Sequence, residues 1–265
     1  MKDVQSQADH RQIDIDQVGV SDLKYPIVVL DRDNERQATV ATLKMSVNLP
    51  HHFKGTHMSR FIEILGDHRG EMTMQTMPAL LKDMRERLEA ESARVEVAFP
   101  YFLERAAPAS GASGLMDYEC TFLGEVGSGG DDFVLGVKVP VTSLCPCSKA
   151  ISDYGAHNQR GYITIEVRTS RLSGGEMDMV WIEELVEVAE ASASAPVYPL
   201  LKRADERHVT MQAYDNPVFV EDMVRNVAGR LQADLRVAWF KVHAVNHESI
   251  HNHGAYAQIE WQRPV

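Results

Sequence analysis

The second half of the chain repeats the order of strand-like and helix-like segments found in the first half. A repeated supersecondary pattern constrains the fold more than any single segment does. In the first half, β-branched and apolar residues with partial alternation predict strands at 38–49, 56–65, 94–103 and 115–126. In the second half, similar runs predict strands at 133–141, 161–168, 235–245 and 254–261. We therefore expect an α+β fold built from two modules of similar construction.

Predicted helices separate the strands within each half. The first half contains one amphipathic helix, and Pro78 lies where this helix begins. Its apolar residues follow helical spacing and are Met77, Leu80, Leu81, Met84 and Leu88. The second half contains a short helix over 182–189 and a longer one over 218–235. We place the modules at residues 36–130 and 131–265, with the boundary near the Gly- and Asp-rich segment 127–132. The alternative is that this segment is only a hairpin turn. Residues 1–35 are polar without a sustained period, so we expect a polar N-terminal arm.

The charge balance excludes several classes of partner. The chain has 38 acidic and 27 basic residues, and a net charge of −11 opposes general binding to nucleic acid or to anionic lipid. A site for a phosphorylated ligand must therefore be local. No apolar run approaches the roughly 18 residues of a membrane-spanning helix, and the polar N-terminus lacks a secretory leader. Three cysteines are too few for a disulfide framework, so we expect a protein of the reducing cytoplasm.

A candidate metal site lies in the segment SLCPCSKAISDYGAHNQRG. Cys145 and Cys147 bracket a proline at the end of a strand, and His157 follows them. A thiolate and an imidazole are two of the roughly three protein ligands that a catalytic zinc ion needs. Glu206 or His208, in the segment LKRADERHV, is a candidate for the third. The alternative is that the cysteines are packed and that the histidine is a polar surface residue.

Histidines are concentrated near the C-terminus, at positions 243, 247, 251 and 253. The second and third of these fit the H-E-x-x-H pattern of zinc proteases, in which both histidines lie on one face of a helix. Strand-like sequence on both sides favours a loop here, which leaves a protease as a remote alternative. In an extended loop, His251 and His253 share a face from which either one donates a proton to a substrate.

Glu221 and several basic residues are candidates for binding a charged ligand. Glu221 lies in the first turn of the predicted helix 218–235, where a carboxylate also compensates the helix dipole or pairs with Arg225. Local positive charge for a phosphorylated substrate is available at Lys149, Lys202, Arg203 and Arg207. Solvated surface charge is the alternative role of these four residues.

Five separated segments, in their order along the chain, resemble the type IB GTP cyclohydrolase I family. They are the cysteine-containing segment quoted above and KGTHMSRF (54–61), LLKRADER (200–207), NPVFVEDMVRNVA (216–228) and NHESIHNHGAYA (246–257). The resemblance extends over about residues 35–262. It implies a tunnelling fold (T-fold), in which two fused modules each have a four-stranded antiparallel sheet with helices on one face.

The resemblance also implies a reaction and a cofactor. The reaction is hydrolytic opening of the guanine imidazole ring of GTP, which releases formate and forms 7,8-dihydroneopterin triphosphate. This hydrolysis of cyclic amidine C–N bonds is the first step toward tetrahydrofolate and other pterins, and toward queuosine-type bases. The implied cofactor is a divalent metal ion, zinc or manganese, bound by Cys145, His157 and Glu206. Cys147 would lie beside it as a further catalytic residue, and which cysteine is the ligand stays open.

The remaining implied roles concern the substrate and the assembly. Glu221 resembles the family's purine anchor, since a carboxylate accepts two parallel hydrogen bonds from the N1–H and 2-amino groups of guanine. His251 or His253 is the candidate donor of a proton to N7. The family forms homotetramers with active sites at subunit interfaces, so we expect His57 and Arg60 to bind the triphosphate at a neighbouring chain's site. A non-catalytic purine- or pterin-binding protein of the same fold is the main alternative.

Overall fold

The computed structural model describes residues 5, 7, 9–170 and 178–264. The chain divides into two compact units, residues 1–100 with 121–134 and residues 101–120 with 135–265. Three long strands contribute residues to both units: β3 (Ala93–Ala106), β4 (Ser113–Gly127) and β5 (Gly130–Leu144). The predicted boundary between residues 130 and 131 lies at the start of β5, just after the β4–β5 turn, whereas the chain changes unit inside the three strands.

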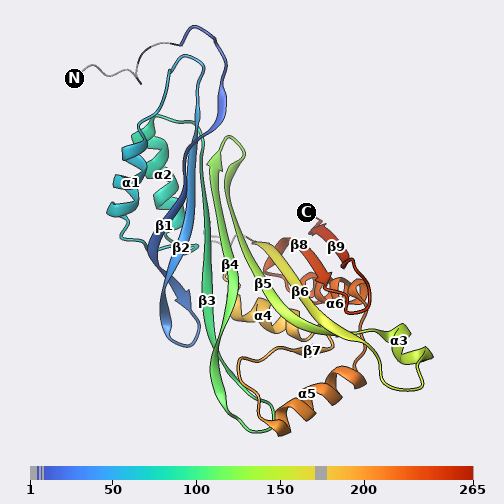
Figure 1. Ribbon diagram of the computed structural model, residues 1–265. Helices are drawn as coiled ribbons and strands as arrows, with labels where there is room; N and C mark the ends of the chain where they lie inside the picture. The colour runs from blue at the N-terminus through green and yellow to red at the C-terminus, as the bar shows by residue number, and fades with distance from the viewer. Residues whose placement is uncertain (1–4, 6, 8, 171–177, 265) are drawn as a thin grey trace. The chain divides into compact units, whose positions relative to one another are not determined.

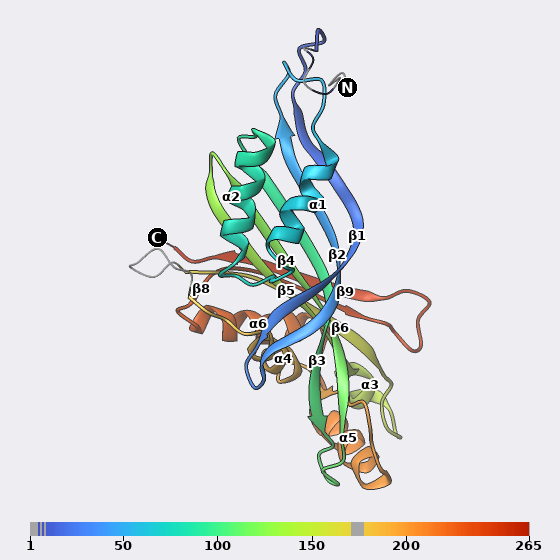
Figure 2. The ribbon, with the colours of Figure 1, turned by 90° about the vertical axis from the view of Figure 1, so that its left-hand side faces the viewer.

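In the first unit, two helices cover one face of an antiparallel sheet (Figure 2). The hydrogen-bonded order is β1–β2–β3–β4–β5, beginning with β1 (Ile15–Asp31) and β2 (Glu35–Leu49). The helices are α1 (Met58–Asp67) and α2 (Met77–Leu88). Apolar residues of the helices and of alternate strand positions form the core, which includes Leu43, Met45, Phe61, Ile64, Met84 and Val95.

Two predictions for the first half are wrong. Residues 56–65, predicted as a strand, belong mainly to α1, because Phe61, Ile64 and Leu65 are buried at the three- and four-residue spacing of a helix. Residues 15–31 of the predicted arm form β1. Positions before Ile27 are exposed or half-buried, so the sequence there lacks the buried alternation that predicts a strand. Residues 1–4, 6 and 8 of that arm lie outside the described residues.

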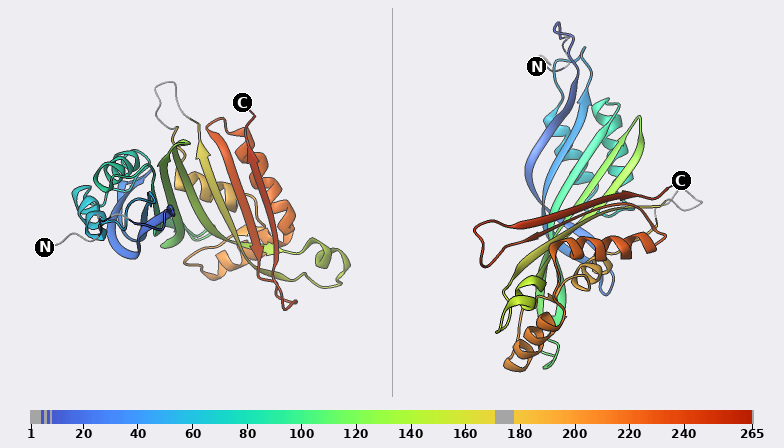
Figure 3. Two further views of the ribbon diagram at one scale, coloured as in Figure 1. Left: turned by 90° about the horizontal axis from the view of Figure 1, so that it is seen from above. Right: turned by 90° about the vertical axis from the view of Figure 1, so that its right-hand side faces the viewer.

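In the second unit, helices again lie on one face of an antiparallel sheet (Figures 1 and 3). After β5 the strand order continues through β6 (Asn158–Thr169), β8 (Val237–Asn246) and β9 (Ala255–Gln262), and the short β7 (Ala195–Pro196) pairs with β5. The packed helices are α4 (Ile182–Glu190) and α6 (Val220–Ala233). The predicted strands and helices of this half, and the α+β class, are confirmed.

Two helices of the second unit were not predicted. The buried residues of α5 (Arg203–Asp215) are Asp205 and Ala213, so the helix has no apolar stripe for periodicity to detect. The short α3 (Pro146–Ile151) buries none of its residues. No helix among the described residues has the length and apolar character needed to cross a membrane.

Residues 101–120 join the second unit because buried polar groups attach them to its helices. The hydroxyl of Tyr101 donates to the carboxylate of Glu183 in α4 over 2.7 Å. The buried carboxylate of Asp205 in α5 accepts from the hydroxyl and the backbone N–H of Ser110 over 2.6 and 2.8 Å. These bonds, the hydroxyl first, hold the pKa of Asp205 well below its usual range. Such long-range pairs have no signature in a hydrophobic pattern.

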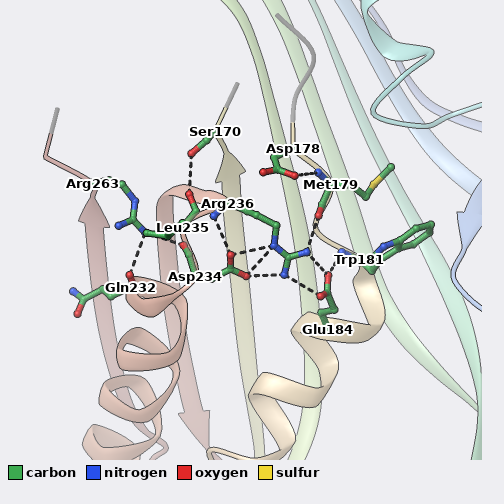
Figure 4. Close-up of polar contacts among 10 residues, drawn as sticks. All are labelled: Ser170, Asp178, Met179, Trp181, Glu184, Gln232, Asp234, Leu235, Arg236 and Arg263. Atoms are coloured by element: carbon green, nitrogen blue, oxygen red, sulfur yellow. Dashed lines mark hydrogen bonds and ion pairs between the residues drawn. The ribbon is translucent and has the colours of Figure 1, made fainter. Parts of the chain in front are cut away.

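Arg236, immediately before β8, holds the ends of two helices together (Figure 4). Its guanidinium donates to Asp234, just after α6, over 2.7 Å and to Glu184 in the first turn of α4 over 2.9 Å. A further bond runs to the carbonyl oxygen of Met179 over 2.9 Å. Because the same group binds both carboxylates, it fixes α6 relative to α4, and α6 carries one wall of the site described next.

Candidate active site

A cleft of about 280 Å³ lies in the second unit, where the end of β5, the start of β6, the start of α6 and the β8–β9 loop meet. Strand register brings these segments together, since Leu144 pairs with Asn158 and Gly161 pairs with Asn246. The polar residues that line the cleft are Ser143, Cys145, His157, Gln159, Glu221, Asn246, Glu248, His251 and His253.

Cys145 and His157 occupy neighbouring strand ends. The backbone N–H of Cys145 donates to the carbonyl oxygen of His157 over 3.1 Å. Cys145 is also the N-cap of α3, and its half-buried sulfur accepts from the backbone N–H of Ser148 over 3.4 Å. Cys147, in the same short helix, is exposed and does not line the cleft. Of these two cysteines, Cys145 is therefore the one at the cleft.

Among the described residues, the ring of His157 is engaged through one of its two nitrogens. Its Nδ1 lies 2.9 Å from Oε1 of Gln159 and 4.0 Å from Oε2 of Glu248. A histidine held through Nδ1 presents Nε2 to a ligand, the usual arrangement around a bound metal ion. Together with the sulfur of Cys145, this nitrogen forms a donor pair that fits zinc or another borderline divalent ion.

A complete ligand set is not assembled around this pair. No group of three or more His, Cys, Asp or Glu side chains in the described part of the chain is arranged to hold a metal ion. Glu206 is exposed in the first turn of α5 and does not line the cleft, and His208 is exposed on the same helix. The nearby carboxylate is that of Glu248, on the Nδ1 side of His157.

The β8–β9 loop brings two histidines to the cleft. The rings of His251 and His253 stack with centroids 5.1 Å apart and planes at 16°, so they share a face, although the chain bends at residues 249–253 instead of running extended. The H-E-x-x-H segment 247–251 is not helical, and the ring of His247 instead meets the ring of Tyr162 edge-on. The protease alternative therefore lacks the helix that its motif requires.

Glu221 lines the cleft from the first turn of α6. The pair with Arg225 is made by the neighbouring Asp222, which lies 3.5 Å from Arg225 and also accepts from the backbone N–H of Phe219 over 3.3 Å. Glu221 keeps its place near the positive end of the helix dipole. No hydrogen bond or ion pair connects Glu221 with another of the described side chains. Its carboxylate is thus available to a ligand.

The predicted phosphate-binding residues lie outside the cleft lining. Lys202, Arg203 and Arg207 are exposed around the start of α5. The ammonium of Lys149 donates to the carbonyl oxygen of Tyr214 and lies 4.2 Å from the centre of its ring. Lys149 is thereby directed toward the end of α5.

The two candidates from the first half lie in the first unit. His57 is the N-cap of α1, and the guanidinium of Arg60 donates to the carbonyl oxygen of Arg87 over 2.7 Å. Within one chain they form part of a separate unit from the cleft.

Three polar cleft residues were not singled out from the sequence: Ser143, Gln159 and Asn246. They continue the buried alternation of their strands, in register with buried residues such as Val141, Ile163 and Ala244. A polar residue at an inward strand position was therefore an available signal. Glu248, the glutamate of the H-E-x-x-H segment, also lines the cleft, from the β8–β9 loop.

Comparison with known proteins finds sequences similar to this chain over nearly its whole length. The family model for type I GTP cyclohydrolase FolE2 matches residues 1–257. A GTP cyclohydrolase FolE2 of Geotalea uraniireducens is 55% identical over 98% of this chain and 93% of its own length. That of Nitrosococcus oceani is 51% identical over 99% of this chain and 96% of its own length.

Solved structures show the same fold at low sequence identity. Uricase from Arthrobacter globiformis matches with a TM-score of 0.52 at 10% identity, covering 94% of this chain and 93% of that one. Urate oxidase from Bacillus sp. TB-90 matches with a TM-score of 0.56 at 8% identity, covering 94% and 100%. The chain thus shares the two-module tunnelling fold of urate oxidase.

Proposed function

The chain belongs to the type I GTP cyclohydrolase FolE2 family, and from this premise we propose that the cleft of the second unit is its active site. The enzyme converts GTP to dihydroneopterin triphosphate by hydrolytic opening of the guanine imidazole ring. One observation carries the assignment of the site. Side chains suited to metal binding, base recognition and proton transfer converge on one cleft from the β5–β6 loop, the start of α6 and the β8–β9 loop.

Glu221 is assigned to guanine recognition. Its carboxylate faces the cleft without another partner among the described residues. An ionised carboxylate accepts parallel hydrogen bonds from N1–H and the 2-amino group of guanine. Adenine has an acceptor at N1 and no 2-amino group, so it would leave the carboxylate unpaired, and such a mismatch discriminates strongly between substrates.

Cys145 and His157 would hold a divalent ion, zinc or manganese. Glu206 is proposed as the third protein ligand from the family resemblance, because this structure places it outside the cleft lining. When bound, the ion would supply Lewis acidity for the attack of water on the purine. Glu248 is not assigned as a ligand, because its carboxylate lies 4.0 Å from Nδ1 of His157, whereas Nε2 is the ring nitrogen that would bind the ion. Cys147 is assigned as a further catalytic residue that lies beside the metal site.

His251 or His253 supplies the proton that N7 of guanine takes up as the imidazole ring opens. Both rings line the cleft, and their stacking places two potential acids side by side. General acid catalysis of this kind contributes about 10²–10⁴-fold to a rate.

The triphosphate extends from the cleft to cationic side chains around it. Those of the second unit are Lys149, Lys202, Arg203 and Arg207. We assign His57 and Arg60 to the site of a neighbouring chain, in a homotetramer with active sites at subunit interfaces. The proposed location is the cytoplasm, where the free cysteines stay reduced.

The test is turnover by the purified chain loaded with Zn2+ or Mn2+ and supplied with GTP. We expect release of formate together with formation of a fluorescent pterin after oxidation of the product. The non-catalytic alternative makes a different prediction, namely GTP binding without formate. Absence of formate with both metals would reject the catalytic assignment.

A further inference from the structure

A buried hydrogen-bond cluster centred on the hydroxyl of Ser143 lines the cleft. Its oxygen lies 3.2 Å from the carbonyl oxygen of Val218, 3.3 Å from Nε2 of Gln159 and 3.0 Å from Nδ2 of Asn246. The exposed fractions of Ser143, Gln159 and Asn246 are 1%, 8% and 3%. Polar groups buried to this extent usually have partners within the protein. Here the hydroxyl of Ser143 and the NH2 groups of Gln159 and Asn246 are paired, whereas Oδ1 of Asn246 is buried without a partner among the described residues.

The chemistry of the cluster determines the direction of each bond. A hydroxyl has one hydrogen and the carbonyl oxygen of Val218 only accepts, so Ser143 donates to Val218. The lone pairs of Ser143 then accept from the NH2 groups of Gln159 and Asn246. With its NH2 group turned toward Ser143, Gln159 presents Oε1 to the ring of His157, 2.9 Å from Nδ1.

This orientation determines the tautomer of His157. Because an amide oxygen only accepts, Nδ1 carries the ring proton and Nε2 is bare in the neutral imidazole. A bare ring nitrogen is the form that binds a metal ion. The other acceptor near Nδ1, Oε2 of Glu248, lies at 4.0 Å, beyond hydrogen-bond distance.

We propose that Ser143 and Gln159 are positioning residues, which hold His157 in the Nδ1–H tautomer and present Nε2 to the divalent ion. The metal-directed part of this role rests on the proposed function, in which His157 is a ligand. The cluster also holds the segment that precedes Glu221, the proposed guanine anchor. Val218 accepts from Ser143 through its carbonyl oxygen and donates its N–H to the carbonyl oxygen of Leu144 over 3.1 Å. One set of buried bonds thus joins both parts of the site.

The tautomer is measured in metal-free, full-length protein by long-range 1H–15N correlation NMR of the histidine rings, with His157→Gln to assign the signal. In the neutral imidazole of His157 we expect the Nδ1–H form. Gln159→Leu removes the acceptor and should abolish this preference. Gln159→Glu keeps an acceptor and should retain it. An Nε2–H form in the wild-type protein would overturn the proposal.

Zn2+ affinity, measured by competition with a chromogenic chelator, gives a second readout. We expect Gln159→Leu and Ser143→Ala to weaken binding by about 10–100-fold, and Gln159→Glu to remain close to the wild type. Ser148→Ala is the matched control, because its hydroxyl accepts from the backbone N–H of His157 over 3.2 Å without contacting the ring. It should change neither tautomer nor affinity.

The outcomes distinguish failure of the positioning role of Ser143 and Gln159 from failure of the proposed metal site. Unchanged Zn2+ affinity and tautomer in both Gln159→Leu and Ser143→Ala, in variants that thermal unfolding shows to be folded, would overturn the positioning role. If Gln159→Leu does not fold, Ser143→Ala and Gln159→Glu carry the test. An Nδ1–H His157 in a protein that binds neither Zn2+ nor Mn2+ would instead reject the proposed metal site, and the metal-directed role with it.

Discussion

Cys145 donates its backbone N–H to the carbonyl oxygen of His157, and this 3.1 Å bond closes the loop between β5 and β6. Leu144 and Asn158 form the adjoining pair in the strand register. The two side chains therefore leave the sheet as neighbours despite the segment between them, which contains α3. Their proximity depends on the strand pairing, which sequence spacing alone does not reveal.

Replacing Cys145 with Ala should remove bound metal and turnover from a protein that stays folded. The side chain is half-buried, so its loss costs little hydrophobic burial. We expect Zn2+ affinity to fall by more than about 100-fold, because changes to groups behind a ligand already cost about 10–100-fold. Metal analysis and thermal unfolding measure both quantities. Cys147→Ala is the control and should retain metal. The reverse result would exchange the roles of the two cysteines.

The third ligand is identified by comparing Glu206→Gln with Glu248→Gln. We expect Glu206→Gln to lower metal content and Glu248→Gln to spare it, since Glu248 lies on the Nδ1 side of His157. Loss of a direct ligand should weaken Zn2+ binding at least as much as the roughly 10–100-fold cost of changing a group that only hydrogen-bonds to a ligand. Equilibrium dialysis followed by metal analysis gives the ranking. Loss of metal from Glu248→Gln alone would transfer the ligand role to Glu248.

Glu221→Gln should lose GTP binding while retaining metal. The amide replaces one acceptor with a donor that faces a donor of guanine, and breaking one side of a buried charged pair costs on the order of 2–5 kcal/mol. Calorimetry with GTP measures the loss. Asp222→Asn is the matched control in the same helical turn, because Asp222 caps α6 through Phe219. It should reduce stability and leave GTP affinity unchanged. A Glu221→Gln variant that binds GTP as tightly as the wild type would remove Glu221 from base recognition.

Periodic segments and separated motifs made much of this molecule predictable. The helix α2 follows from five buried apolar residues at helical spacing, and α6 from a similar stripe. Prediction was wrong for α1, where a short run such as THMSRFIEIL allows both periods and burial of Phe61 and Leu65 decides between them. It missed α5, whose buried residues include a carboxylate with partners in residues 109–110.

The cleft was predictable where reactive residue types mark it and less so where neutral ones do. Cys145, His157 and Glu221 stand out in the sequence because cysteine, histidine and glutamate are residue types that commonly bind metals or bases. Ser143 and Gln159 are common polar residues, and their importance appears only when strand register brings them to within 3.3 Å of each other. Their inward positions in β5 and β6 were the physical clue, since an inward polar residue needs a partner.

Arg60→Ala should impair the use of GTP without removing metal, if its guanidinium serves the site of a neighbouring chain. Mixing inactive Arg60→Ala chains with inactive Glu221→Gln chains should then restore part of the activity, because some interfaces receive two intact halves. Formate release after subunit exchange measures the recovery. An active monomer by light scattering, or exchange without recovery, would reject the shared site.

Asp234→Asn should destabilise the protein at neutral pH and matter less in acid. Bonding to Arg236 lowers the pKa of Asp234 in the folded protein (Figure 4). A lowered folded pKa means that the unfolded chain binds the proton more readily, so the stabilisation is complete above the ordinary aspartate pKa of about 3.9 and is lost as pH falls through the folded value.

For this partly exposed ion pair we expect a loss of about 1 kcal/mol at neutral pH, measured by urea unfolding. The backbone N–H of Arg236 donates to Oδ1 of Asp234 over 2.9 Å, and an asparagine oxygen can still accept this bond. The substitution therefore measures the contribution of the carboxylate charge. The difference between wild type and variant should shrink once the pH falls below about 4. Glu119→Gln, which breaks the exposed 3.0 Å pair with Lys138, should change stability by less than about 0.5 kcal/mol. A pH-independent loss in Asp234→Asn would mean that packing, rather than charge, holds this corner of α6 to α4.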